Sequence, residues 1–210
     1  QLSGGMRQRA ALLRTYLFSR DVALLDEPFS SLDENLREEM RSLVAQLHRE
    51  FGMTTVLVTH DREEALAMSH RVAVMSAGKI LQYDAPEEVY RHPANRTVAD
   101  YFGDCCYLGG RVENGRFVSE IFACEAMLPD GRYDLMLRAG AIRTEQAGDL
   151  ALTVRQIQFR GVDTLVTLEA GNGQRWKCSL RDCPAWSVGE TVSCDVTLDE
   201  CVFFSQDNRE

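Results

Sequence analysis

Four short segments within the first sixty residues carry side chains that could act together on a phosphate group. The first is Leu2-Ser3-Gly4-Gly5, which leads directly into a helical pattern that begins at Met6. A helix N-terminus offers unpaired N–H groups and a partial positive charge, and both favour an anion. Ser3, Gly4 and Gly5 are therefore candidate phosphate contacts, with a plain capped turn as the alternative interpretation.

The second segment is an apolar run, Val22–Leu25, that ends in two adjacent carboxylates, Asp26 and Glu27. The run predicts a strand buried on both faces of a parallel sheet, and ligands bind beyond the carboxyl ends of such strands. Asp26 is then placed to hold Mg²⁺, and Glu27 could polarise a water molecule for attack on a phosphate. The alternative is a solvated strand end, because acidic residues are common in turns.

The third and fourth segments extend this pattern. Asp33 precedes a predicted amphipathic helix over residues 34–51 and is a good N-cap for it. A β-branched run over residues 54–59 predicts a second buried strand, and His60 follows it. If the two strands are neighbours, Glu27 and His60 lie on one rim, where an imidazole can hydrogen-bond a phosphate. The alternative for His60 is a structural role.

The elements that must position these residues alternate between helix and strand through residues 1–100, which predicts an α/β core with an open parallel sheet. Ala77-Gly78 marks a hairpin within this part. Beyond residue 100 the chain has short strand patterns and turn signals such as Asn114-Gly115, which predict a small all-β barrel or sandwich. We therefore expect two domains, residues 1–100 and 101–210, joined by a hinge near residues 91–95.

Composition excludes several classes of function. The net charge is −9 and the pI is near 5.0, which argues against a nucleic-acid partner because phosphate backbones require clustered positive charge. No apolar run approaches the roughly 20 residues that span a bilayer. The seven cysteines show no paired zinc spacing, and free thiols in a reducing cytoplasm are the expected state.

Taken in order, the four segments resemble the C-terminal part of an ABC ATPase: the LSGG signature, the Walker B strand, the D-loop and the H-loop. Glu63-Glu64-Ala65 and the segment over residues 86–90 resemble the importer subfamily that serves sugars, polyamines, iron and oxyanions, with the ferric-iron and polyamine branches most similar. The β-rich part is similar to the accessory OB-like domain known as TOBE. Two positions depart from the family pattern: Met6 replaces the usual Gln, and Ala139-Gly140 follow Arg138 where Pro-Glu is common.

The resemblance implies a role for each candidate residue. Ser3, Gly4 and Gly5 would contact the γ-phosphate of an ATP held by a second copy, and Asp33 would couple the two sites. Asp26 would hold Mg²⁺, Glu27 would be the catalytic base, and His60 would contact the γ-phosphate. The implied partners are that second copy in a homodimer, transmembrane permease subunits and, indirectly, a solute-binding protein. The implied location is the cytoplasmic face of the membrane.

A phosphate-binding P-loop does not occur in the sequence. Such a loop needs Gly-x-x-x-x-Gly-Lys-Ser/Thr, whereas of the two lysines only Lys79 follows a glycine, and Ile80 comes next. We therefore interpret the chain as a fragment whose N-terminal part, with the P-loop, is missing. One alternative is a non-catalytic dimerisation or regulatory β-module. An ABC ATPase of DNA repair or translation fits poorly, because the chain is acidic.

The absence of that loop generates a first prediction. We expect the 210-residue chain alone to release no phosphate from ATP, because nothing in it grips the β- and γ-phosphates. A phosphate-release assay on the purified chain, with Glu27→Gln as the control, checks this. Turnover that disappears in the variant would contradict the prediction.

Overall fold

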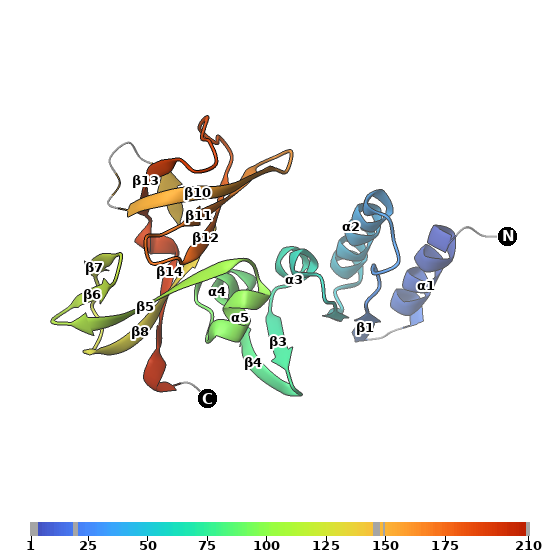
Figure 1. Cartoon of the computed structure of the whole chain (residues 1–210). Helices are drawn as coiled ribbons and strands as arrows, with labels where there is room; N and C mark the ends of the chain where they lie inside the picture. Colours follow the sequence, from blue (N-terminus) through green and yellow to red (C-terminus); the bar gives the residue numbers. More distant parts are fainter. Residues whose placement is uncertain (1–3, 19–20, 145–147, 149, 209–210) are drawn as a thin grey trace. The chain divides into compact units, whose positions relative to one another are not determined.

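The computed structural model describes residues 4–18, 21–144, 148 and 150–208. The chain forms two compact units: residues 1–73 with 83–86 make the first, and residues 74–82 with 87–210 make the second. Figure 1 traces the elements of each unit along the chain. The division expected near residue 100 stays a prediction. Among the residues that the structure describes, no helix is long and apolar enough to cross a membrane.

The first unit alternates helices and strands, as its sequence predicts. Its elements in chain order are α1 (Gly4–Phe18), β1 (Val22–Asp26), α2 (Glu34–Phe51), β2 (Thr54–Val58) and α3 (Arg62–Met68). β1 and β2 pair in parallel, in a register that runs from Val22 opposite Thr54 to Asp26 opposite Val58. The two strands are therefore neighbours, which is the condition for Glu27 and His60 to share one rim.

The helices begin and end where capping residues dictate. Asp33 caps α2 by accepting a hydrogen bond from the Leu36 N–H at 3.0 Å. Gly52 ends the same helix in the left-handed region, with φ 61°, and its N–H donates to the His48 carbonyl at 3.0 Å. Asp61 caps α3 in the same way as Asp33 caps α2. The helix predicted over residues 34–51 therefore has the predicted limits.

The core of the first unit joins α1 and α2 to one face of the strand pair. Its buried side chains include Leu12, Tyr16, Ala23, Leu25, Phe29, Met40, Val44 and Leu47. At the edge of this core, Thr55 is the hydrogen-bond partner of two polar groups. Its hydroxyl lies 3.1 Å from the Tyr16 hydroxyl and 3.2 Å from His48 Nδ1. Apolar burial and a few paired polar groups thus hold the strands against the helices.

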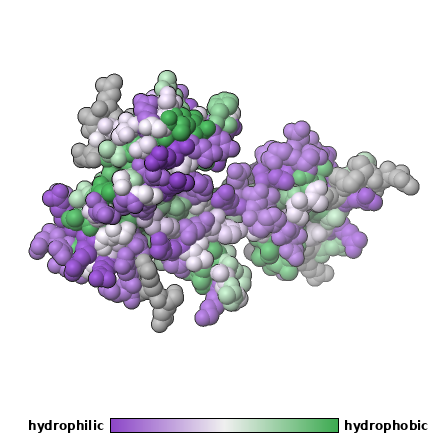
Figure 2. All heavy atoms as spheres, viewed as in Figure 1, coloured by the Kyte–Doolittle hydropathy of each residue, from purple (hydrophilic) through white to green (hydrophobic). Residues whose placement is uncertain are grey.

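The expectation that both strands are buried on two faces is wrong. Ala23 and Leu25 are buried, but Val22 and Leu24 are 48% and 71% exposed, and Val56 and Val58 are also exposed. Figure 2 shows hydrophobic side chains at the surface of the unit that contains these strands. An unbroken apolar run indicates a strand but does not say how many of its faces are covered. The helices of this unit pack on one face.

A hairpin and two short helices follow. β3 (Val72–Ser76) and β4 (Lys79–Asp84) pair, and their turn has Ala77 at φ 47° and Gly78 at φ 75°, the signs required by a type I′ turn. This confirms the predicted hairpin. α4 (Pro86–Arg91) and α5 (Arg96–Tyr101) enclose the segment predicted as a hinge. Asn95 caps α5 by accepting from Val98 N–H at 3.0 Å.

Two antiparallel five-stranded sheets make up most of the second unit. One has the order β14-β8-β5-β6-β7 and the other β12-β11-β10-β13-β9. The first sheet comprises β5 (Cys105–Glu113), β6 (Arg116–Ser119), β7 (Ala123–Glu125), β8 (Gly131–Arg138) and β14 (Cys201–Ser205). The second comprises β9 (Ile142–Thr144), β10 (Leu150–Phe159), β11 (Thr164–Glu169), β12 (Arg175–Leu180) and β13 (Thr191–Val196). Asn114 and Gly115 form the predicted turn between β5 and β6, with φ 53° and 76°.

Side chains of both sheets meet in one core. They include Leu108, Phe117, Leu135 and Leu137 from the first sheet with Val154, Val166, Leu168 and Trp176 from the second. The predicted small all-β barrel or sandwich is therefore confirmed. All seven cysteines are free, and Cys178 and Cys194 lie fully inside this core. Burial raises the pKa of Cys178 to about 12 and that of Cys194 to about 11.

Two arginines fasten the short helices to the first sheet. Arg138, at the end of β8, donates to the Tyr90 carbonyl of α4 at 2.6 Å and lies 4.0 Å from the centre of the Tyr90 ring. Arg96, at the start of α5, pairs with the buried Asp134 at 3.3 Å and lies 3.8 Å from the Tyr107 ring centre. Arg138, which the sequence left without a clear role, is thus a packing residue of the second unit.

The contact between β5 and β6 generates a second prediction. A Cβ on Gly110 would lie 2.5 Å from Phe117 Cζ and 2.6 Å from the Val118 carbonyl oxygen. Because Phe117 is fully buried and cannot yield freely, Gly110→Ala should lower the free energy of unfolding by about 1–3 kcal/mol. Gly171→Ala is the matched control, since nothing lies within 4 Å of its Cβ position. Equal midpoints of the two variants in urea would contradict the prediction.

Candidate functional site

The parallel pairing of β1 and β2 brings two predicted site residues together. Glu27 follows β1 directly, and its N–H donates to the Val58 carbonyl at 2.8 Å, which continues the ladder one residue beyond the strand. His60 follows β2 by two residues. His60 Nδ1 lies 3.0 Å from Glu27 Oε1. The side chains predicted to share one rim are therefore in hydrogen-bond contact.

Glu27 changes the protonation of His60. The imidazole is 71% exposed and the carboxylate 45% exposed, so both can reach a ligand in solvent. The hydrogen bond and the charge of Glu27 raise the pKa of His60 above its ordinary value of 6.5, and the carboxylates of Asp61 and Glu64 add to that effect. The protonated ring has two N–H donors, so it can donate to Glu27 and to a second acceptor together.

The backbone at Glu27 adopts an unusual conformation. Its φ of 43° is in the left-handed region, which non-glycine residues seldom adopt. Ser30 stabilises this turn, because its N–H and its hydroxyl both donate to the Glu27 carbonyl, at 3.3 and 3.1 Å. Backbone strain of this kind is often found at functional sites. The backbone conformation of Glu27 therefore marks it as a candidate functional residue, independently of the chemistry of its side chain.

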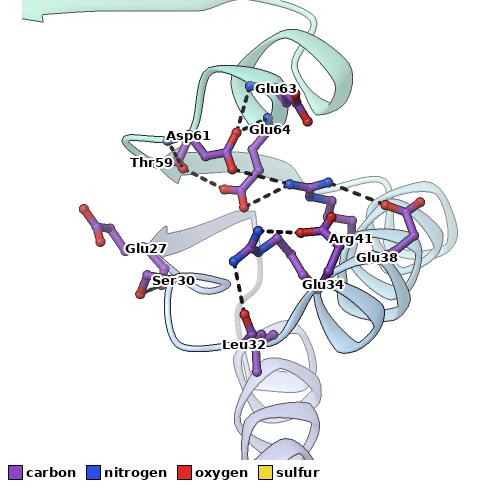
Figure 3. A network of polar contacts seen from close by, with 11 residues as sticks. Glu27, Ser30, Leu32, Glu34, Glu38, Arg41, Thr59, Asp61, Glu63 and Glu64 are labelled. Carbon is purple, nitrogen blue, oxygen red and sulfur yellow. Dashed lines mark hydrogen bonds and ion pairs between the residues drawn. The ribbon is translucent and has the colours of Figure 1, made fainter. Parts of the chain in front are cut away.

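A small hollow contains this pair. It is lined by Glu27, Ser30, Arg37, Thr59, His60, Asp61 and Glu64. Figure 3 shows five of them: Glu27 and Ser30 lie beyond the end of β1, and Thr59, Asp61 and Glu64 lie between β2 and the first turns of α3. Arg37 adds a guanidinium, which donates to the Leu32 carbonyl at 3.1 Å and to Glu34 at 2.8 Å. The hollow thus combines carboxylates, an imidazole and a cation, a set suited to proton transfer and to an anionic ligand.

Asp26 opens to a different hollow. Asp26 is exposed at the end of β1, in a depression lined by residues of α1 such as Thr15, by β1 and by Pro28. Asp26 and Glu27, adjacent in sequence, therefore line separate hollows. Among the described residues, no cluster of three or more His, Cys, Asp or Glu side chains could enclose a metal ion. A metal at Asp26 would need water or ligand oxygens as further donors, as Mg²⁺ commonly has.

The remaining predicted residues lie at helix starts. Asp33 is the N-cap of α2, so its structural interpretation holds, while its coupling role stays a prediction. Gly4 and Gly5 belong to the first turn of α1, two residues earlier than the helical pattern suggested. Ser3 lies outside the described residues. Helix ends assigned from sequence commonly shift by one or two residues.

Sequence reasoning missed the residues that surround the rim. Thr59 donates to Glu64 at 2.6 Å, and Arg41 of α2 lies 3.5 Å from Glu64 and 3.6 Å from Asp61. Two signals were present. Asp61 and Glu64 have the spacing of a helix-capping pair, and Arg37 and Arg41 are one turn apart on α2. Neither signal says that α2 and α3 meet.

Comparison with known families identifies the class of the β-rich part. Residues 135–204 match the family model described as the TOBE domain. These residues run from β8 to β14 and include strands of both sheets. Together with the parallel strand pair that ends in Glu27 and His60, this domain is typical of an importer-type ABC ATP-binding subunit.

Relatives support the same class. The spermidine/putrescine import ATP-binding protein PotA of Mesorhizobium japonicum is 39% identical over 186 residues, which cover 83% of this chain and 51% of that protein. PotA of Borreliella afzelii is 35% identical over 207 residues, covering 95% and 59%. The sulfate/thiosulfate import ATP-binding protein CysA of Vibrio cholerae is 49% identical over 119 residues, covering 57% and 32%.

These matches confirm the resemblance drawn from the motifs: the chain is similar to importer-type ABC ATP-binding subunits, and its residues 135–204 match the TOBE domain. The chain spans about half the length of the polyamine-importer relatives it matches.

The contact between Glu27 and His60 generates a third prediction. Glu27→Gln removes the charge and weakens the hydrogen bond, so the pKa of His60 should fall toward its ordinary value. Titration of the His60 ring signals by NMR measures this, with Glu50→Gln at the far end of α2 as control. Because the pKa of His60 is higher in the folded than in the unfolded chain, its protonation stabilises the fold at low pH. This contribution disappears as the pH rises through the folded-state pKa of His60. An unchanged His60 pKa in Glu27→Gln would contradict the contact.

Proposed function

We propose that this chain acts, within the intact protein, as the ATP-hydrolysing subunit of an ABC import system. The observation that carries the proposal is the 3.0 Å contact between Glu27 and His60 beyond the carboxyl ends of two parallel strands. Ligands of open α/β sheets bind at that edge. ATP binding and hydrolysis would then drive solute uptake by switching membrane subunits between two states.

Each residue of the rim has a defined task in this proposal. Glu27 uses one carboxylate oxygen to accept from His60, and its second oxygen orients or deprotonates the attacking water. His60, protonated more readily because of Glu27, donates its other N–H to a γ-phosphate oxygen. Catalysis is then mainly positioning and stabilisation of charge on the transferred phosphoryl group.

Asp26 is the proposed Mg²⁺ residue. Its exposed carboxylate suits a hard cation that keeps several waters and takes most other ligands from phosphates. The metal would supply neutralisation of the charge that develops on the phosphates. Asp26 would fix the position of that ion relative to Glu27, its neighbour in the chain.

The proposed assembly supplies the parts of the site that this chain does not hold. A second copy would bind the other ATP, and Ser3, Gly4 and Gly5 would contact the γ-phosphate of that ATP. Asp33 would transmit closure from one site to the other. Transmembrane permease subunits, and indirectly a solute-binding protein, complete the system, with the ATPase on the cytoplasmic face of the membrane.

The proposed solute is a polyamine. The similarity to the PotA proteins of Mesorhizobium japonicum and Borreliella afzelii covers 83% and 95% of the chain and so includes the β-rich unit. The similarity to CysA of Vibrio cholerae covers 57%. Sulfate or thiosulfate is therefore the second candidate. Calorimetry of the partner solute-binding protein with spermidine and with sulfate distinguishes them.

The fourth prediction tests the role of Glu27 in the full-length protein. Glu27→Gln should lower kcat for ATP hydrolysis by about 100-fold or more, because the general base is lost, while ATP still binds. The ATP-bound protein should accumulate as a closed dimer, which size-exclusion chromatography with ATP detects. Glu50→Gln is the control for loss of a carboxylate. Undiminished turnover in Glu27→Gln would refute the assignment.

A further inference from the structure

Arg41 is the charged residue through which α2 reaches the loop that carries His60. It lies in the middle of α2, and its side chain is only 14% exposed. Its guanidinium is 3.5 Å from Glu38 on its own helix, 3.6 Å from Asp61 and 3.5 Å from Glu64. Figure 3 shows the guanidinium of Arg41 directed at the start of α3, where Asp61 and Glu64 meet it. One cation thus bridges two helices.

Glu64 explains why a cation is needed there. Its side chain is 4% exposed, so an ionised carboxylate at this place has lost nearly all of its water. Arg41 compensates that charge through Oε1, and Thr59 donates to Oε2 at 2.6 Å. In a usual capping box the Glu at this position reaches back to the N-cap backbone. Here it accepts instead from a side chain two residues before the N-cap.

Thr59 and Asp61 enclose His60 in the sequence, and both are fixed. The Thr59 hydroxyl accepts the Asp61 N–H at 3.0 Å while it donates to Glu64. Asp61 in turn accepts from the N–H groups of Glu63 and Glu64 at 2.8 and 3.2 Å. His60 itself is largely exposed, so little packing holds its ring. The loop that carries the ring is therefore held through its neighbours.

We infer that Arg41, Glu64 and Thr59 are positioning residues that hold the loop over residues 59–61 so that His60 faces Glu27. The chain of contacts runs from the α2 guanidinium to the buried carboxylate, then to the hydroxyl, then to the backbone next to His60. None of the three needs to touch a ligand. That these residues affect ATP hydrolysis rests on the proposed function. That they hold the loop so that His60 faces Glu27 does not.

Thr59→Val gives the sharpest test, because it removes the hydroxyl and alters no charge. We expect the His60 pKa to fall toward its ordinary value in this variant, since the ring is then held less often against Glu27. Thr59→Ser keeps the hydroxyl and should keep the raised pKa. The other three of the four histidines serve as references in the same NMR titration of the 210-residue chain. An unchanged His60 pKa in folded Thr59→Val would overturn the inference.

Arg41→Gln tests the first contact of this series, between Arg41 and Glu64. The measurement is a nuclear Overhauser contact, which reports the distance between two side chains and not their charge. We expect the nuclear Overhauser contact between the His60 ring and the Glu27 side chain to weaken or disappear. Arg49→Gln removes the same charge from an exposed site on the same helix and should leave that contact intact. If Arg41→Gln does not fold, Arg41→Lys keeps the charge but replaces the guanidinium fork, and it should weaken the same contact. An undiminished contact in the folded variant would overturn the role of Arg41.

The full-length ATPase separates this inference from the proposed function. Thr59→Val should lower kcat roughly 10- to 100-fold with little change in KM for ATP, because a misplaced group costs rate more than binding. Thr59→Ser should restore the rate. If the His60 signals move in Thr59→Val while kcat does not, the positioning role stands and the catalytic role of His60 fails. If neither changes, the positioning role fails.

Discussion

The parallel pairing of β1 with β2 is the constraint from which the site follows. Asp26 opposite Val58, with the Glu27 N–H on the Val58 carbonyl, fixes where each strand ends relative to the other. A slip of one residue would turn Ala23 and Leu25 out of the core and move Glu27 away from His60. The burial that stabilises the strand pair therefore also sets the distance between Glu27 and His60.

The helix α2 contributes to the structure in two ways, through apolar packing and through a buried ionic network. Its apolar stripe of Met40, Val44 and Leu47 packs into the core, which is a non-directional contribution to stability. Arg41, on the same helix, enters a network with buried Glu64, where charge desolvation offsets much of the attraction. Such a network contributes little net stability, but it defines one geometry. A buried ionic group beside the loop that carries His60 fits a gain in precision better than a gain in stability.

Much of the first unit could be predicted from its sequence, because local signals and tertiary structure agree there. Asp33 and Gly52 mark the limits of α2, and the β-branched run marks β2. The burial of the strands could not be predicted, since an apolar run does not say what covers it. β7 and β9 have only three residues each, too few for an alternation pattern to show in the sequence. Glu27 and His60 were found because strand ends are visible in sequence, whereas the contact of Arg41 with Glu64 depends on two helices meeting.

The two thiols inside the β-rich unit have a consequence of their own. Cys178 and Cys194 are fully buried, and their raised pKa values leave almost no thiolate at neutral pH. Since the thiolate is the species that reacts with alkylating agents and oxidants, both groups are protected twice, by lack of access and by protonation. A reagent reaches them only when the core of this unit opens. The rate at which a thiol reagent labels them therefore measures how often this unit opens, and no cysteine has to be introduced for that measurement.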